Sequence, residues 1–451
     1  MAKKSFKKAK EPGFVPMAVV NPNAAGIDVG DTIHAVAVPK DRDEQPVRSF
    51  GTMSCDLQEI ALWLEKCGVE TIALESTGVY WKPLFNYLIR YGFEVYLVNA
   101  RHVRNVTGRK NDQSDAQWLQ QLHSCGLLIS SYLPDNEQES LRTLVRYRKM
   151  LTEESSRFVL RMQKALELMN IKLHTVINDL MGKTGTAIVE AIIAGERNAE
   201  NFLPFIDRRI KADHQTIVKS LQGNWREEQL FTLAESYQCY KFFQERIATC
   251  DIQIEVQLEQ YAAAGNEGEV PVTEASQVKK KNKRAPKFDT RLFLKSVLGV
   301  DVLAIYGMSE ISALTILAET GTDMSKWPNE KHFVSWLNLC PNNKISGGKL
   351  ISSLLMKKKP NPASQAFRMA ANAVQRSDHW LGDYFRRMKS KGGNKYAVVA
   401  AANKMAIIYY KMVSNHVEFS PLDLQQYQEK RKNAKIAYLE KKLNLLKKQT
   451  A

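Results

Sequence analysis

The sequence predicts an α/β domain at its amino-terminal end and an all-α region over the rest of the chain. The main observation is a change of pattern. Up to about residue 132, short apolar segments of strand type alternate with helical patterns, whereas from Pro134 onward apolar residues recur at steps of three and four over long stretches. A chain of 451 residues is also long enough for two or three domains, each with its own core.

Residues 21–132 hold the α/β pattern. The predicted strands cover 24–29, 32–38, 45–52, 71–74 and 94–98, and the first three can form an antiparallel meander. The predicted helices cover 54–67, 80–91 and 111–125, and Ser54 is a suitable N-cap for the first of them. Three strands followed by helix, strand, helix, strand and helix is the order of an RNase H-like fold.

Two acidic residues lie at the start of the last predicted helix of this domain. Asp112 and Asp115 are three residues apart, so their carboxylates share one helical face. Two acids on one face repel each other unless water, a basic partner or a divalent metal offsets the repulsion. Asp also favours the first turn of a helix, and a plain helix start is the alternative explanation.

Two further acids lie in the predicted strands. Asp28 is in the middle of the first strand, and Glu75 ends the fourth. A carboxylate in an apolar strand is costly to bury unless it is paired or binds a metal. In an RNase H-like sheet the first strand, the fourth strand and the final helix meet at one edge. There Asp28, Glu75, Asp112 and Asp115 would hold two Mg²⁺ ions about 3.5–4 Å apart and act on a phosphodiester.

Residues 133–264 are predicted to form a central region of long helices with coiled-coil character. In the first run, Arg148 and Ser155 interrupt an apolar seam that otherwise continues to Leu180. A second run of the same type covers 226–262. The two runs can pair as an antiparallel hairpin, form a dimer interface or provide the core of an ordinary helical domain, and we expect a role in oligomerisation.

Positive charge is concentrated in the second half of the chain. The net charge of +16 and the pI near 9.4 favour a polyanionic partner, such as nucleic acid or an anionic membrane surface. In a predicted compact helical domain (291–415), residues 341–411 hold 14 Lys and Arg against two Asp. Because phosphates would neutralise this charge, this segment is the predicted nucleic-acid face.

Three other segments are basic. They are a flexible arm (1–20), a polar linker with the run KKKNKR (265–290) and a tail (416–451) with a helical pattern. The linker is predicted to be a hinge near nucleic acid, and a nuclear-localisation signal is the weaker alternative. The tail is either a solvated helix or an additional phosphate-binding arm.

Several classes of protein are disfavoured by composition. No run of 18 or more apolar residues is present, and the basic amino-terminal segment lacks the apolar core of a secretory signal. The six cysteines are scattered without CxxC spacing, which argues for reduced thiols in a cytoplasm and against a zinc site or a disulfide framework.

Several motifs in their order along the chain resemble a known family. They are GIDVG (26–30), LESTG (74–78) followed by an aromatic-rich helix with Tyr80 and Trp81, GRKNDQSDA (108–116), LRTLVRYRK (141–149), IYGMSEISALTILAETG (305–321), the segment 327–341 and KISGGK (344–349). Together they resemble the DEDD transposases of the insertion-sequence one-ten family. The resemblance covers most of the chain apart from roughly 190–290, the tails and the basic arm.

The resemblance implies a RuvC-like first domain and a bridge-RNA-guided DNA recombinase with a catalytic serine in the C-terminal domain. By motif match that serine is Ser346. The implied partners are donor and target DNA and a structured guide RNA, in a bacterial or archaeal cytoplasm. Since strand exchange between two duplexes needs several active sites, we expect a homodimer that assembles into a tetramer.

The surroundings of Ser346 suit this role. It precedes two glycines and lies between Lys344 and Lys349. Such a serine could attack a DNA phosphate and conserve the bond energy in a phosphoserine ester. Without the resemblance a flexible Ser-Gly-Gly turn is the simpler interpretation, and Ser352 and Ser353 are nearby competitors. The predicted nucleic-acid contacts are Arg109, Lys110, Lys344, Lys349, Lys357, Lys358 and Lys359.

Segment 305–321 suggests a second phosphate contact. It resembles a helix–turn–helix hairpin whose backbone amides can grip a phosphate at a helix N-terminus, and a plain turn between packed helices is the alternative. The family usually has a second glycine where this chain has Ser309, and a glycine after the basic run where it has Pro360.

Three other functions remain as alternatives. A RuvC-like branched-DNA endonuclease needs no serine intermediate. A sugar kinase-like ATPase shares the RNase H-like core, and DVGDT (28–32) matches its first phosphate loop, but the second loop and the adenosine turn are missing. A nucleic-acid bridging protein without enzymatic activity is the third.

Overall fold

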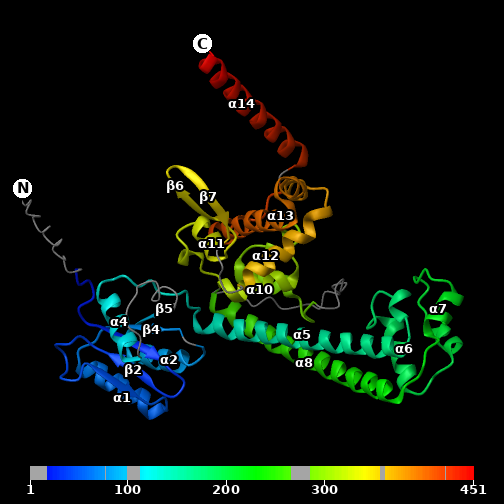
Figure 1. Ribbon diagram of the computed structural model, residues 1–451, viewed down its shortest axis with the longest axis horizontal. Helices are drawn as coiled ribbons and strands as arrows, with labels where there is room; N and C mark the ends of the chain where they lie inside the picture. The colour runs from blue at the N-terminus through cyan, green and yellow to red at the C-terminus, as the bar shows by residue number, and fades with distance from the viewer. Residues whose placement is uncertain are drawn as a thin grey trace, which may run out of the picture. The chain divides into compact units, whose positions relative to one another are not determined.

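The computed structural model describes residues 18–76, 78–98, 112–265, 285–355, 361–421 and 423–450, without the side chains of residues 112–114, 264–265, 441–442 and 444–450. The chain forms two compact units, Met1–Leu133 and Pro134–Ala451, whose elements are labelled in Figure 1. Among the described helices, none combines the length and the apolar content needed to span a bilayer.

The first unit is a five-stranded mixed sheet with the strand order β3-β2-β1-β4-β5. Its strands are β1 (Ala24–Val29), β2 (His34–Ala37), β3 (Val47–Phe50), β4 (Thr71–Glu75) and β5 (Glu94–Val98). The first three pair antiparallel, and β4 and β5 run parallel to β1. The helices are α1 (Ser54–Lys66), α2 (Trp81–Tyr91) and α4 (Asp112–Ser124). This arrangement confirms the predicted α/β part and is compatible with an RNase H-like domain.

The two faces of the sheet are covered by different helices. Ile27 of β1 and Leu74 of β4 are fully buried in one apolar cluster with Leu64 of α1 and Leu84 of α2. The opposite face is covered by α4, whose Ala116 packs in a second cluster with alanines of β2. Because strand side chains alternate between faces, each residue that follows a core position on β1 or β4 points toward the side of α4.

Helix α4 approaches β1 closely at Gly26. A Cβ atom there would lie 2.3 Å from the backbone nitrogen of Gln120 and 2.5 Å from the carbonyl oxygen of Ala116, so any larger residue would push the helix away. Farther along α4, His123 Nε2 and Thr71 Oγ1 of β4 are 2.9 Å apart. Burial lowers the pKa of His123, so the neutral imidazole makes this contact. These contacts hold α4 on β1 and β4.

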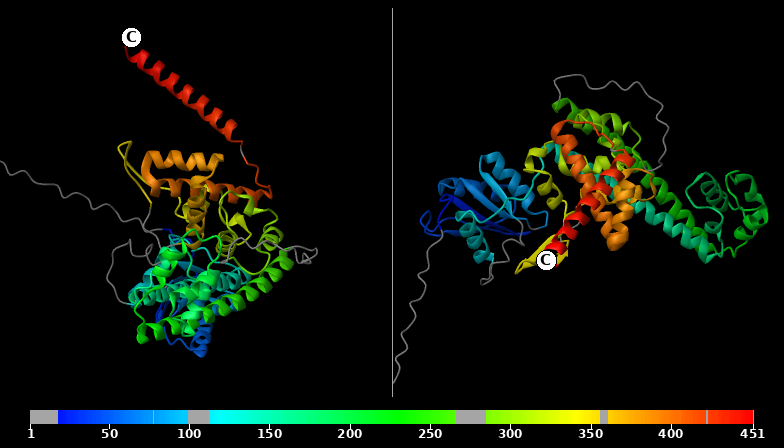
Figure 2. Two further views of the ribbon diagram at one scale, coloured as in Figure 1. Left: turned by 90° about the vertical axis from the view of Figure 1, so that its right-hand side faces the viewer. Right: turned by 90° about the horizontal axis from the view of Figure 1, so that it is seen from above.

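The second unit begins with two long helices that pack antiparallel, α5 (Asn136–Leu168) and α8 (Glu227–Gly265), which lie side by side in Figures 1 and 2. Arg148 of α5 forms a buried ion pair with Asp251 of α8, and Gln244 Nε2 donates to Ser155 Oγ at 2.8 Å. The two residues that interrupt the apolar seam therefore carry the polar contacts between the helices. Of the alternatives, the structure shows the antiparallel hairpin. Supercoiling and a dimer interface stay predictions.

The predicted continuation of the first helix to Leu180 is wrong. α5 ends at Leu168, and Asn170 has the left-handed φ of 58°, which turns the chain out of the helix. Leu173 and Leu180, which continue the apolar spacing, are instead buried in a helical lobe between α5 and α8. Its elements are η1 (Leu173–Thr175), α6 (Lys183–Ile193), η2 (Ala199–Phe205) and α7 (His214–Leu221).

The rest of the second unit is mostly helical, as predicted. Its helices are α9 (Thr290–Leu298), η3 (Val302–Ala304), α10 (Glu310–Thr320), η4 (Met324–Lys326), α11 (Glu330–Trp336), α12 (Pro362–Ala373), η5 (Val374–Arg376), α13 (Trp380–Asn415) and α14 (Leu424–Thr450). The fully buried rings of Phe333, Phe367 and Tyr409 lie at its centre.

One part of this domain is not helical. β6 (Asn342–Ser346) and β7 (Lys349–Leu354) form a two-stranded antiparallel sheet, which Figure 1 shows in yellow. The prediction of a purely helical domain over 291–415 was therefore wrong at this hairpin. Helical periodicity is absent from this short stretch, and two glycines close it into a turn.

Candidate active site

Asp28 and Glu75 lie side by side in the sheet of the first unit. β1 and β4 are parallel neighbours with Ile27 opposite Leu74, so the next residue of each strand is Asp28 and Glu75. Neighbouring strands are about 4.8 Å apart. Ile27 and Leu74 face the core of α1 and α2, and the two half-buried carboxylates therefore point to the face that α4 covers.

The start of α4 lies at the same end of β1. Gln120 Nε2 donates to the carbonyl oxygen of Ala24 at 3.2 Å, and one turn earlier Ala116 lies against Gly26. The helix therefore runs opposite to β1, and its first turn, which starts at Asp112, lies toward the strand end that carries Asp28.

The two acids of α4 differ in what the structure shows. Asp115 is half-buried in the first turn. Asp112 is the first residue of the helix, but its side chain is not among those that the structure describes. The fold thus brings β1, β4 and the start of α4 to one edge of the sheet, as the sequence predicted. The assignment of all four acids as ligands stays a prediction.

The carboxylate edge, defined as Asp28, Glu75, Asp112 and Asp115, has the right chemistry for Mg²⁺. Carboxylate oxygens are the ligands that Mg²⁺ prefers, and two carboxylates on neighbouring strands repel each other less when a divalent cation lies between them. Within the side chains that the structure describes, no three acidic, imidazole or thiol groups are placed to hold a metal ion. Because Asp112 is outside that set, the edge still fits the ion through its donor chemistry.

Ser346 is the last residue of β6 and lies directly before the turn of the hairpin. Gly347 and Gly348 have φ values of 55° and 75°, the two left-handed positions that a type I′ turn requires. Ser346 is paired with Lys349 across the strands, and Lys344 is two residues before it on the same strand. The register shifts between Lys344 and Ile345, and the extra residue, Ile351, is on β7. The alternation along β6 is therefore kept, and both lysines lie on the face of Ser346. The serine is the last paired residue of a β-hairpin.

The other face of the hairpin is apolar at its end. Ile345 is paired with Leu350, and their side chains are 66% and 60% exposed. Further from the turn, Ser353 Oγ donates to Asn343 Oδ1 at 2.8 Å. None of the residues of β6 and β7 is buried. The hairpin therefore presents Ser346 and two lysines on one face and aliphatic side chains on the other, all open to solvent.

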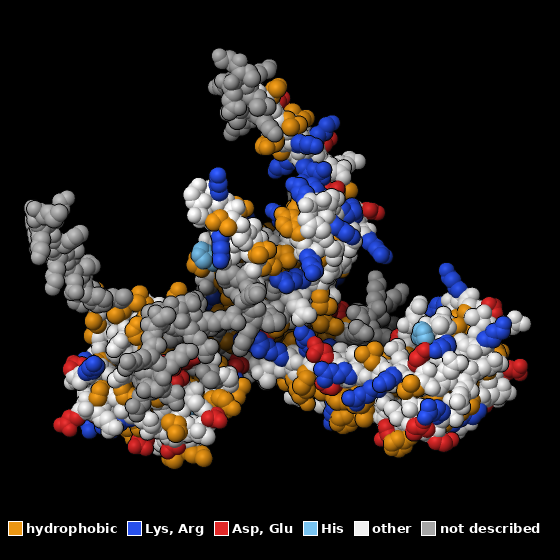
Figure 3. All heavy atoms as spheres, in the orientation of Figure 1, with side chains coloured by type: hydrophobic (Ala, Val, Ile, Leu, Met, Phe, Trp, Pro, Cys, Tyr) orange, Lys and Arg blue, Asp and Glu red, His pale blue; other side chains and the backbone are white. Residues whose placement is uncertain are grey.

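The other predicted nucleic-acid contacts fall outside the described residues. Arg109 and Lys110 lie in the gap 99–111, and Lys357, Lys358 and Lys359 lie in the gap 356–360. Their roles stay predictions. Figure 3 shows Lys and Arg side chains over α13 and α14, within and beyond the segment predicted as the nucleic-acid face.

The structure gives no support to a phosphate site at the N-terminus of α10. Ser309 caps this helix and accepts a hydrogen bond from the backbone N–H of Ser312 at 3.2 Å. Glu310 follows in the first turn, where burial and then nearby Asp289 raise its pKa. Ser309, which stands where the family usually has a glycine, thus accepts the hydrogen bond of a backbone N–H that a phosphate would need.

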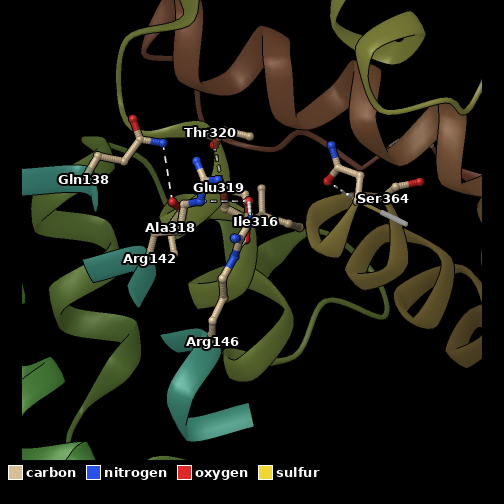
Figure 4. Close-up of polar contacts among 9 residues, drawn as sticks. Gln138, Arg142, Arg146, Ile316, Ala318, Glu319, Thr320 and Ser364 are labelled. Atoms are coloured by element: carbon tan, nitrogen blue, oxygen red, sulfur yellow. Dashed lines mark hydrogen bonds and ion pairs between the residues drawn. The ribbon is translucent and has the colours of Figure 1, made fainter. Parts of the chain in front are cut away.

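Two motifs meet at a buried acid that the sequence did not single out. Glu319 of α10 is buried and lies 2.7 Å from Arg146 and 3.5 Å from Arg142, both on α5 (Figure 4). Gln138 Nε2 donates to the carbonyl oxygen of Ala318 at 3.4 Å. These contacts join LRTLVRYRK to AETG. The available signal was an acid within the apolar run at the end of this helix, which needs a basic partner when buried.

Two family models match this chain, one over the carboxylate edge and one over the serine hairpin. A transposase model of the IS110 DEDD type matches residues 25–171, which include the carboxylate edge. A second model, described as transposase IS116/IS110/IS902 family, matches residues 301–386, which include the serine hairpin. No curated protein matches the chain. Because the two models match in the order and at the elements that the motifs predicted, the chain belongs to the IS110 family of transposases, DNA-cleaving and DNA-transferring enzymes of mobile elements.

Proposed function

We propose that this transposase exchanges DNA strands through a covalent phosphoserine intermediate on Ser346. The observation that carries the proposal is the hairpin, which places an exposed serine between Lys344 and Lys349 on one face. The two ammonium groups attract a backbone phosphate and favour the negative charge that develops on its oxygens during attack.

The reaction balances without a cofactor that carries electrons. Ser346 Oγ forms a bond to phosphorus and loses its proton, while the bond from phosphorus to one deoxyribose oxygen breaks and that oxygen takes up a proton. The phosphoserine ester conserves the energy of the phosphodiester. Attack by the hydroxyl of another DNA strand then releases the serine and joins the new strand.

The carboxylate edge has a separate role. Asp28, Glu75, Asp112 and Asp115 would hold Mg²⁺, which when bound neutralises charge on the phosphate and orients it. The role of these residues is then to fix the phosphate, while the nucleophile comes from the second unit. The hydrolytic alternative assigns them the activation of water instead.

The partners follow from the charge and from the family. The net charge of +16 suits DNA and the guide RNA implied by the resemblance. Exchange between two duplexes needs more than one serine, so we include a dimer that assembles into a tetramer. The sugar kinase-like ATPase has no support from either family match.

Trapping the covalent adduct tests the proposal. The full chain is incubated with Mg²⁺, the RNA transcribed from its element, and labelled DNA that carries the element ends, and the products are separated under denaturing conditions. We expect a protein–DNA adduct whose modified peptide contains Ser346. Ser346→Ala should remove the adduct and strand exchange together.

Ser352 provides the matched control. It is paired with Lys344 on the same hairpin, so Ser352→Ala removes a half-buried hydroxyl beside a lysine. This variant should keep the adduct. If Ser346→Ala cleaves the DNA at the wild-type rate, the branched-DNA endonuclease is the correct function and the serine intermediate is wrong.

A further inference from the structure

A pocket of about 670 Å³ lies in the second unit, away from the serine hairpin in sequence. Its walls come from both halves of α13 and from the segment that leads into α14. Gly393 has the non-helical φ/ψ of 78° and 179°, which breaks α13. The halves before and after this break thereby line one cavity, which we call the α13 pocket. Its volume is in the range of small-ligand sites rather than of extended grooves.

Aromatic rings form a large part of the wall. Trp380 and Tyr384 come from the first half of α13, Phe419 from the following segment and Tyr427 from α14. The rings of Trp380 and Tyr427 are 5.7 Å apart. These two rings are tilted by 49° and already contact each other. The half-buried rings of Tyr384, Phe419 and Tyr427 are the ones left to stack on another planar ring.

Cations surround these rings. Arg387, Lys404 and Lys411 line the pocket, and Lys404 and Lys411 are exposed. Glu418 also lines it, but its carboxylate already accepts a hydrogen bond from the backbone N–H of Asp301 at 3.1 Å. Three cations against one carboxylate leave the lining positive, although Lys411 also lies 3.8 Å from Glu330, and this charge favours an anionic ligand.

Two buried N–H groups in the lining residues need an acceptor. Trp380 is 6% exposed, and its indole Nε1 has no hydrogen-bond partner among the described residues. The same holds for Nε of Arg387, whose Nη2 donates to the hydroxyl of Tyr427 at 3.0 Å. Buried donors without partners are rare because each costs free energy, but both nitrogens are closed to solvent, so neither is open to a ligand in the pocket.

We propose that the α13 pocket binds one unpaired nucleotide of a DNA or RNA strand. The base stacks on the aromatic wall. The adjoining phosphates lie on Lys404 and Lys411. An apolar peptide helix would leave the cations without an anionic partner, and a paired base in a duplex cannot present its face to a ring. The site is separate from Ser346 and needs no part of the serine chemistry.

Photo-crosslinking of the full chain tests this proposal. The probes are short single-stranded oligo-dT with 4-thiothymidine and oligo-U with 4-thiouridine, each irradiated with the protein and analysed by peptide mass spectrometry. We expect crosslinks to peptides that contain Trp380, Tyr384 or Tyr427. The oligonucleotide that crosslinks identifies the sugar, and a duplex of the same base composition should not compete.

Charge variants measure the phosphate contacts. Lys404→Gln with Lys411→Gln changes two exposed side chains and should preserve the fold. For single strands, each lost contact reduces the slope of log affinity against log salt by about 0.7. Tyr384→Leu removes one stacking ring and should weaken binding by about 5- to 150-fold. Lys389→Gln, on the same helix but not in the lining, is the control and should have less effect.

Crosslinks confined to other peptides, or a duplex that competes as well as the single strand, would overturn the proposal. The serine adduct is scored in parallel on the same variants. An adduct with wild-type yield and no crosslink in the pocket would leave the proposed function intact while excluding the nucleotide site.

Discussion

The proposed reaction uses two regions, the carboxylate edge and the serine hairpin, and these differ strongly in burial. Asp28 and Glu75 are half-buried in the central strands of a sheet, with α4 packed against them through Gly26. Ser346 lies on a ribbon in which no residue is buried. A metal site needs oxygens fixed to within a fraction of an ångström, whereas a nucleophile that must be joined to DNA and released again needs access. Packing and exposure divide the chemistry between the two regions.

The largest expected effects come from removing either half. Asp28→Asn keeps the size of the side chain but removes its charge, and Ser346→Ala removes the nucleophile. Each should lower strand exchange on the order of 10⁴-fold or more. Single-turnover assays with labelled DNA measure this. Chelation of divalent metal should match Asp28→Asn and be reversed by added Mg²⁺.

The two regions would not have separate roles if Asp28→Asn and Ser346→Ala showed the same DNA binding and the same dependence of strand exchange on Mg²⁺. Ser346→Ala should still respond to Mg²⁺, because the carboxylates are intact. Unchanged strand exchange in Asp28→Asn would remove the carboxylate edge from the mechanism.

Gly26→Ala tests how rigid the carboxylate edge is. The new methyl group would lie 2.3 Å from the backbone nitrogen of Gln120, so α4 must shift away from β1. Such overpacking costs about 1–3 kcal/mol of unfolding free energy. Denaturant titration measures this cost. Wild-type stability together with wild-type activity would show that α4 is not tightly held there.

Gly348→Ala is the corresponding change in the hairpin. No atom lies within 4 Å of the added methyl group, so only the left-handed φ of 75° is strained, by about 1–2 kcal/mol. We expect unchanged global unfolding and an adduct yield lowered several-fold. Gly348→Asn should restore part of the yield, because Asn tolerates this conformation better. A loss of global stability would mean that the hairpin is packed rather than free.

The smallest effect concerns acid stability of the first unit. Asp43 accepts hydrogen bonds from the backbone N–H of Gln45, from Trp63 Nε1 and from Arg48, which together lower its pKa to about 2. Since this pKa is below the unfolded value of about 3.9, its stabilisation is complete above that pH and is lost as the pH falls through about 2.

Denaturant midpoints between about pH 5 and 2 measure this loss, and Asp43→Asn should flatten that part of the curve. An identical pH profile for the variant would show that other carboxylates control the acid transition. The hairpin variant Gly348→Ala should follow the wild-type profile, since the change lies in a different unit.

Much of the fold was predictable because local spacing determines it. Short apolar runs placed β1 and β4, and the acids within them, and the period of 3.6 placed α4 and α5. Sequence pattern could not show where α5 ends, because Leu173 and Leu180 keep the helical spacing while packing in a separate lobe. It also missed the β6–β7 hairpin, whose strands are short and exposed.

The sequence by itself determined the family, the α/β part and the candidates Asp28, Glu75, Asp112, Asp115 and Ser346. The tertiary structure decided which residues meet. The parallel register placed Asp28 beside Glu75, the antiparallel helices paired Arg148 with Asp251, and Glu319 met Arg142 and Arg146. The physical reason is that spacing along the chain fixes which way a side chain faces, whereas its partner depends on a distant segment and on the close packing that brings the two together.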